Sequence, residues 1–212
     1  MKLEELISTI HRSAFKANQD HSKWTGGWWL SVYGVEGFLV ARIADAIMDP
    51  KNITNPPTYL TLETRFSELY DNHGKLPPER SKQCLNERNR IDIALYTGET
   101  FTHAIEIKRF WSPACLGDLN RLCSLIQHCG KSAGGLLKVG IFVLLIEAKA
   151  RKSQNVHECL NNSFASKEQK CSDYLLKRSD INKYYFSRGT SVIGPEILDN
   201  GWGFSTLCVV VK

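Results

Sequence analysis

The stretch RIDIALYTGETFTHAIEIKRF, residues 90–110, decides the expected fold. Two segments in which apolar and polar residues alternate flank residues 97–100, TGET, and the glycine there is typical of a turn. Alternation with a period of two is the pattern of a β-strand that has one buried face. The stretch therefore predicts a β-hairpin with a loop over residues 97–101, in which Tyr96 pairs with Thr102.

Three charged side chains of this hairpin are expected to lie close together. In the predicted register Asp92 lies opposite Glu106, and Lys108 shares the face of Glu106 because it is two residues further along the strand. Adjacent carboxylates repel each other unless a cation lies between them. Such oxygen ligands suit Mg²⁺, which binds one or two carboxylates and keeps its other positions for water and substrate phosphate. A metal there can polarise a phosphodiester, and a neighbouring lysine can orient or deprotonate the attacking water.

The arrangement Asp…Glu-x-Lys on a hairpin resembles the catalytic core of the PD-(D/E)xK nuclease superfamily, which has the restriction-endonuclease-like fold. The resemblance implies that Asp92 and Glu106 ligate Mg²⁺ or Mn²⁺ with the carbonyl of Ile107, and that Lys108 positions or activates the attacking water. Ile91 stands where the superfamily motif names a proline, which is frequently replaced. The alternative is that Glu-x-Lys marks the solvated face of an ordinary antiparallel strand, where opposite charges are common.

The third acid of the expected site has two candidates. Residues 28–49 predict an apolar helix, and Glu36 lies among its apolar residues between two glycines. The resemblance implies that a glutamate of the helix before the sheet faces the metal site, directly or through water, which matches Glu36. Residues 58–66 are compatible with a strand or a helix, and the resemblance implies that they form the first core strand, which makes Glu63 the rival. The buried face of the helix is expected to contain Trp28, Val32, Val35, Leu39, Ile43 and Ile47.

Other segments supply the rest of an α/β fold, in which helices flank a mixed central sheet. An apolar stripe with helical spacing predicts a helix over residues 3–17, and the polar residues 18–23 are expected to be a linker. A helix is expected over residues 115–129, where Asp118 is interpreted as a residue that favours the helix N-terminus. The continuously apolar run at 139–148 predicts a strand that is buried on both faces.

The chain is expected to form a single domain. Its 212 residues divide into an N-terminal helix and linker (1–23), a catalytic core (24–148) and a basic C-terminal extension (149–212). In the extension, a helix is expected over residues 163–180 and two strands over 191–193 and 207–211.

Composition and charge are those of a globular protein with an uneven basic surface. Hydrophobic residues make up 42% and charged residues 23% of the chain, and no apolar run approaches the length of a membrane span. Residues 148–190 hold nine Lys and Arg against four acids, which accounts for the whole net charge of +5. A local basic surface of this kind is what binding to a phosphate backbone requires, although it is also common on a solvated face. The seven cysteines have no regular spacing and the N-terminus lacks the apolar core of a secretion signal, so reduced thiols and a cytoplasmic location are expected.

Three functional hypotheses follow from these observations. The first is a Mg²⁺-dependent or Mn²⁺-dependent hydrolase of DNA, and the resemblance implies an endonuclease of a restriction or phage-defence system beside a partner protein that recognises or senses DNA. The second is a catalytically inactive subunit with the nuclease fold that binds nucleic acid or a partner protein. The third is an RNA-directed nuclease. A homodimer is a further expectation, because many nucleases of this fold pair to cut two strands and the first helix offers an apolar surface.

Overall fold

The structure is a computed structural model that describes residues 1–30, 34–52, 58–73, 89–151, 154–181, 183–193 and 201–212. Within these ranges one mixed sheet of seven strands has the order β1-β2-β3-β4-β7-β5, and β6 pairs with β7 beside this path. The strands are β1 (Thr58–Arg65), β2 (Arg90–Thr97), β3 (Thr100–Lys108), β4 (Val139–Lys149), β5 (Tyr184–Arg188), β6 (Val192–Ile193) and β7 (Trp202–Val211). Strands β3 and β4 run parallel, and the other neighbouring pairs are antiparallel.

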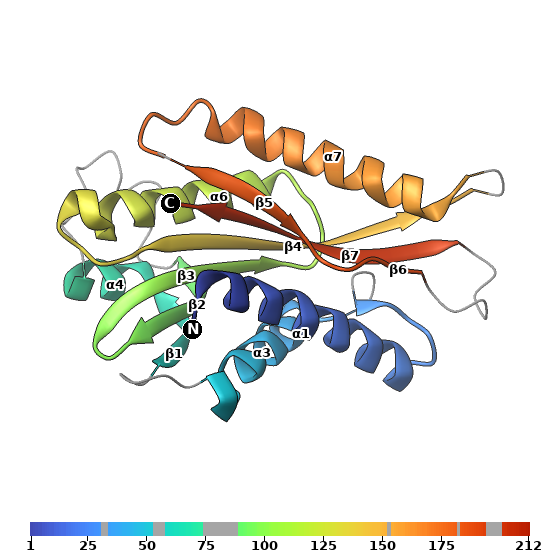
Figure 1. Cartoon of the computed structure of the whole chain (residues 1–212), viewed down its shortest axis with the longest axis horizontal. Coiled ribbons are helices and arrows are strands. Elements are labelled where there is room, and N and C mark those ends of the chain that lie inside the picture. The colour runs from blue at the N-terminus through green and yellow to red at the C-terminus, as the bar shows by residue number, and fades with distance from the viewer. Residues whose placement is uncertain (31–33, 53–57, 74–88, 152–153, 182, 194–200) are drawn as a thin grey trace.

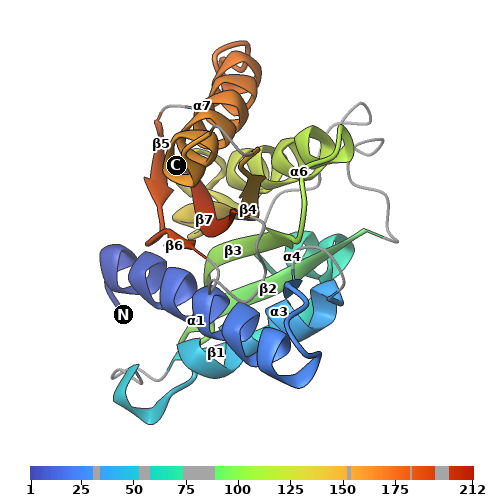
Figure 2. The same cartoon turned by 90° about the vertical axis from the view of Figure 1, so that its right-hand side faces the viewer.

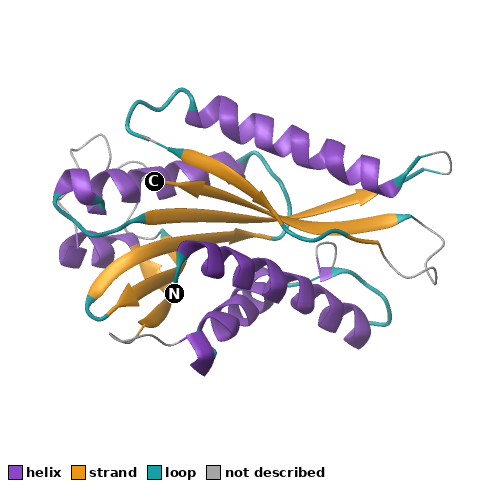
Figure 3. Cartoon of the chain, in the orientation of Figure 1, coloured by secondary structure: helices purple, strands orange, loops and turns teal. Residues whose placement is uncertain are grey.

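Helices cover both faces of this sheet. They are α1 (Leu3–Trp24), α3 (Glu36–Ile47), α4 (Phe66–His73), α6 (Ala114–Cys129) and α7 (Val156–Leu175), with short 3₁₀ turns at Pro50–Asn52 and Lys131–Ala133. Figure 1 and Figure 2 show α6 and α7 on one face and α1 and α3 on the other, and Figure 3 shows the three layers by type of element. Within the described residues, none of the helices has the length and apolar character needed to cross a bilayer.

Strand β4 lies at the centre of the sheet and confirms the prediction of a strand buried on both faces. Because successive side chains alternate, one set packs with α6 and α7 and the other with α1 and α3. The first set contains Phe142, Leu144 and Ile146, and the second contains Ile141, Val143 and Leu145. Two apolar clusters therefore form, one on each side of the sheet.

The hairpin of β2 and β3 is confirmed, but its turn is tighter than expected. Thr97 pairs with Thr100 across a two-residue turn, and Gly98 adopts a φ of 58° that favours glycine at the first turn position. Tyr96 pairs with Phe101 and not with Thr102, because a β-bulge follows in which Thr102 is the extra residue. The hydroxyl of Thr102 donates a 3.1 Å hydrogen bond to the carbonyl of Leu95 at this bulge.

The prediction of a linker at residues 18–23 is wrong, because helix α1 continues to Trp24. Its polar residues have partners that the local sequence does not reveal. The side chain of Asn18 accepts a 2.9 Å hydrogen bond from the backbone amide of Leu30, and Asp20 forms an ion pair with Arg42 of α3. These contacts stabilise two further turns of helix.

The helix expected over residues 28–49 is only partly correct, because α3 begins at Glu36. Val35 has the extended backbone of an N-cap residue and is 72% exposed, and Trp28 is 55% exposed, so neither belongs to a buried helical face. The remaining members of the predicted face within α3, Leu39, Ile43 and Ile47, are buried. Val32 lies outside the described residues.

The C-terminal region differs from the expectation in its bounds. Helix α7 begins at Val156, where the side chain of Asn155 accepts a 2.8 Å hydrogen bond from the amide of His157, and it ends at Leu175. Strand β7 pairs with β4 along ten residue pairs, and β5 was not predicted. The six cysteines in the described ranges are free thiols, and Cys84 lies outside these ranges.

Candidate active site

The strands β2 and β3 separate at one end of the hairpin and form a fork in the sheet. Their pairing ends at Ile93 and Ile105, whereas β2 stays paired with β1 and β3 stays paired with β4 as far as Lys108. Asp92 lies on one branch of the fork, and Glu106 and Lys108 lie on the other. The register before the fork, if continued, places Asp92 opposite Glu106, as the sequence predicts.

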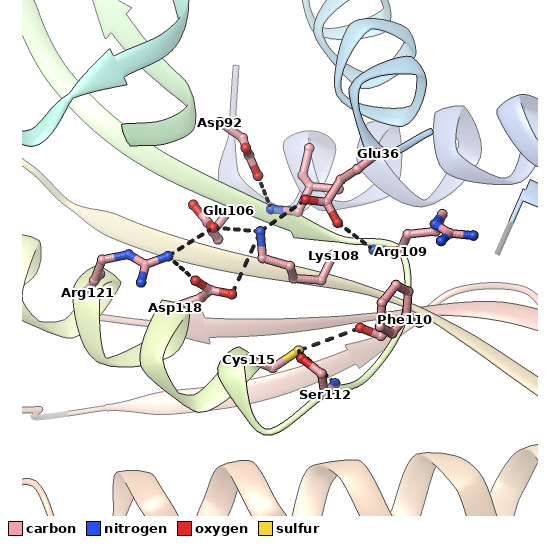
Figure 4. Close-up of polar contacts among 11 residues, drawn as sticks. Glu36, Asp92, Glu106, Lys108, Arg109, Phe110, Ser112, Cys115, Asp118 and Arg121 are labelled. Atoms are coloured by element: carbon pink, nitrogen blue, oxygen red, sulfur yellow. Dashed lines mark hydrogen bonds and ion pairs between the residues drawn. The ribbon is translucent and has the colours of Figure 1, made fainter. Parts of the chain in front are cut away.

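Asp92 bridges the two branches through its carboxylate. Its Oδ2 accepts a 2.6 Å hydrogen bond from the backbone amide of Ile107, which takes the place of the missing ladder bond (Figure 4). Burial raises the pKa of Asp92 to about 6, although the Ile107 hydrogen bond and the charge of Lys108 act in the opposite direction. The charges of Glu36 and Glu63 contribute further to the increase.

Glu106 is the most deeply buried acid of the fork, with 3% of its surface exposed. Burial, followed by the nearby charge of Asp92, raises its pKa to about 8. Its Oε1 lies 2.9 Å from Lys108 Nζ, but its Oε2 has no hydrogen-bond partner among the described residues. An unpartnered buried carboxylate oxygen is costly, so Oε2 could accept a further ligand.

Lys108 lies at the centre of the cluster. Its Nζ is 2.9 Å from Glu106 Oε1, 3.2 Å from Glu36 Oε1 and 3.7 Å from Asp118 Oδ2. Burial opposes the charged form of the lysine, but the carboxylates around it outweigh this effect and raise its pKa. Lys108 is therefore a firmly charged ammonium group in the absence of other ligands.

Glu36 and Glu63, the two candidates for the third acid, lie in different settings. Glu36 is the first residue of α3, and its Oε2 accepts a 3.2 Å hydrogen bond from the amide of Arg109 while Oε1 contacts Lys108. Glu63 is exposed on β1 and has a φ of 52°, the one positive φ of a non-glycine residue in the described ranges. The structure therefore brings Glu36 into direct contact with the cluster, whereas Glu63 acts on Asp92 through its charge.

Two residues of α6 complete the cluster and were not assigned to it from the sequence. Asp118 is buried and forms an ion pair with Arg121, whose Nη2 also lies 3.6 Å from Glu106 Oε1. The expectation that Asp118 serves the helix N-terminus misses these contacts. The signal in the sequence is a pair of opposite charges three residues apart on a helix whose neighbouring residues are mostly apolar.

The charges of this cluster are unbalanced. Four carboxylates, those of Glu36, Asp92, Glu106 and Asp118, face the two cations Lys108 and Arg121, so full ionisation leaves a formal charge of −2. A divalent cation would neutralise this charge. In the part of the chain that the structure describes, no three His, Cys, Asp or Glu side chains converge as a complete metal-ligand set. The pair Asp92 and Glu106 nevertheless fits Mg²⁺, which needs only one or two carboxylates.

Comparison with known proteins adds no relative to this geometry. No family model matches the chain, and no curated protein or solved structure is significantly similar to it. The function therefore has to be inferred from the cluster itself.

Proposed function

We propose that the chain is a metal-dependent nuclease of the PD-(D/E)xK type, which hydrolyses phosphodiester bonds of DNA at the fork of β2 and β3. The observation that carries the proposal is the unpartnered Oε2 of Glu106, which is buried beside Asp92 and 2.9 Å (through Oε1) from an ammonium group. Most buried carboxylate oxygens in proteins have a partner, and Glu106 differs from the other unpartnered acid of the described residues, Glu147, because it lies beside Asp92 and Lys108.

The order of the elements supports the resemblance noted in the sequence. A helix with an acidic first residue (α3), an antiparallel hairpin with Asp…Glu-x-Lys (β2 and β3), a helix (α6) and a buried strand (β4) occur in this order, with β1 and α4 between α3 and the hairpin. This succession is the one that the resemblance implies for the catalytic core.

Asp92 and Glu106 would hold Mg²⁺ or Mn²⁺, and their donor atoms are the hard oxygens that these ions prefer. The carbonyl of Ile107 is a suitable additional ligand, because the amide of Ile107 points toward Asp92 and the two polar groups of a strand residue face the same neighbour. The metal would supply charge neutralisation and polarisation of the phosphate.

Lys108 would position the attacking water and not deprotonate it. Its pKa is raised, so it donates hydrogen bonds and does not accept a proton while the carboxylates around it are charged. Glu36 would fix Lys108 and the amide of Arg109 in place, which makes it a positioning residue. A role in a restriction or phage-defence system, with a partner protein that recognises DNA, belongs to the same proposal.

A second candidate is a catalytically inactive subunit with the same fold. It is favoured by the contacts of Lys108 with three carboxylates, because such a network can persist without metal. The two candidates differ in metal binding at Asp92 and Glu106.

Cleavage and metal titration by the full chain test the proposal. Supercoiled DNA, linear DNA and RNA are incubated with Mg²⁺, Mn²⁺ or EDTA, and calorimetry measures Mn²⁺ binding. We expect metal-dependent cleavage that falls at least about a hundredfold in Glu106→Ala and Lys108→Ala, while circular dichroism shows both variants folded. The control is Glu99→Gln, at the exposed tip of the same hairpin. Cleavage that persists in both variants would place the active site elsewhere, and Mn²⁺ binding without cleavage would support the inactive subunit.

A further inference from the structure

An exposed aromatic ring lies two residues beyond Lys108. Phe110 is 53% exposed, and the guanidinium group of Arg109 lies 5.1 Å from the centre of its ring. The loop that carries it is held by the thiol of Cys115, which accepts a 3.3 Å hydrogen bond from the amide of Ser112 and donates one of 3.6 Å to the carbonyl of Phe110 (Figure 4). Phe110 is therefore an apolar surface fixed at the edge of the candidate active site.

The ring of the next residue, Trp111, contacts two lysines of α7. The ammonium groups of Lys167 and Lys170 lie 5.7 Å and 5.6 Å from the centre of the Trp111 ring. Burial and the charge of Lys170 lower the pKa of Lys167, so the two cations repel each other. Neither lysine forms an ion pair with a carboxylate of the described residues. An anion at this position would relieve the repulsion.

We propose that Phe110 and the pair Lys167–Lys170 form a binding track for single-stranded nucleic acid that leads to Lys108. A base would stack on the ring of Phe110, and the lysines would contact the adjacent phosphates. The bases of a duplex are already stacked on one another, whereas an unpaired base offers a free face to an aromatic ring. The inference rests on the proposed nuclease function and specifies its substrate as an unpaired strand.

Binding measured in EDTA tests this track without cleavage. Fluorescence anisotropy compares labelled single-stranded DNA, single-stranded RNA and duplex DNA of equal length. We expect at least one of the two single-stranded probes to bind at least about tenfold more tightly than the duplex. Phe110→Ala should weaken the binding of that probe about tenfold. Phe110→Leu keeps an apolar side chain but no aromatic face, so it should bind as weakly as Phe110→Ala. The double variant Lys167→Gln/Lys170→Gln should lower the slope of log K against log salt by about 1.4, which corresponds to two phosphate contacts.

Matched controls separate this track from general surface effects. Leu136→Ala removes an exposed apolar side chain, and Lys131→Gln/Lys138→Gln removes the same charge beyond the other end of α6. Equal losses in the controls and the variants, or tighter binding of the duplex, would overturn the inference. If the single strand binds as expected but no metal-dependent cleavage occurs, the proposed nuclease function fails and the binding track stands. If duplex is cleaved through Glu106 while single strands do not bind, the binding track fails and the nuclease function stands.

Discussion

Replacement of Glu106 by glutamine tests whether ionisation of the buried carboxylate at the fork destabilises the folded chain. The pKa of Glu106 is raised from 4.5 to about 8 by burial and by Asp92, so the folded chain keeps a proton there at pH values at which the unfolded chain has lost it. The free energy of unfolding therefore decreases as the pH rises from about 4.5 to about 8. A glutamine has no proton to lose, so the variant should lack this decrease.

The size of the effect follows from the shift. One pKa unit corresponds to about 1.4 kcal/mol, which sets a ceiling of about 5 kcal/mol on the loss of stability. Because local relaxation of the fold and water penetration offset part of it, we expect about 2–3 kcal/mol. For a domain of this size, this is a difference of roughly 5–10 °C in the melting temperature. Between pH 5 and pH 9, the Glu106→Gln variant should gain this much over the wild type.

Thermal unfolding followed by circular dichroism in EDTA at pH 5, 7 and 9 measures the difference, and Glu99→Gln makes the same chemical change in solvent as a control. Addition of Mn²⁺ at pH 8 should stabilise the wild type, because the ion binds the folded state, and should stabilise Glu106→Gln much less. A melting difference between wild type and Glu106→Gln that stays constant from pH 5 to pH 9 would refute the reasoning, because Glu106 would then ionise without cost.

Two further predictions concern stability away from the fork. Asn18→Ala should cost about 1–3 kcal/mol in urea unfolding, because the buried amide of Leu30 loses its acceptor, whereas Asn161→Ala on the exposed face of α7 should have little effect. Burial lowers the pKa of His11 to about 4, so the folded chain binds fewer protons than the unfolded chain between pH 6.5 and pH 4, and stability should fall over this window as the pH falls. His11→Gln should remove up to about 3 kcal/mol of this pH dependence, and an unchanged pH profile would contradict the assignment.

The elements that were predicted correctly are those whose signal is local. The hairpin is encoded by a period of two around a glycine turn, and β4 by an uninterrupted apolar run. The misplaced bounds depend on contacts between distant residues. The last turns of α1 need Leu30 and Arg42 as partners for their polar side chains, and β5 exists because it pairs with β7.

For the candidate site too, the sequence predicted the residues that depend on a local pattern and missed those that depend on packing. Asp92, Glu106 and Lys108 follow from strand alternation, because a register fixes which side chains share a face. From helix α6, Asp118 reaches Lys108 and Arg121 reaches Glu106, and the angle at which α6 lies on the sheet is not encoded by any short pattern. The ambiguity between Glu36 and Glu63 likewise needed the packing of α3 against the end of β3.

Thr102, the extra residue of the bulge, determines which residues of β2 and β3 lie opposite each other between the turn and the fork. The turn pairs Thr97 with Thr100, and an unbroken ladder from there would set Asp92 opposite Ile105. Glu106 and Lys108 would then face the layer of α1 and α3, on the far side of the sheet from Asp92. Closing the bulge at the present chain length would therefore leave the composition of the hairpin intact while it separates the two carboxylates onto opposite surfaces, whereas deletion of Thr102 would remove the bulge and keep Asp92 opposite Glu106. The bulge, more than the identity of the residue in it, therefore decides whether Asp92 and Glu106 lie on one face of the sheet.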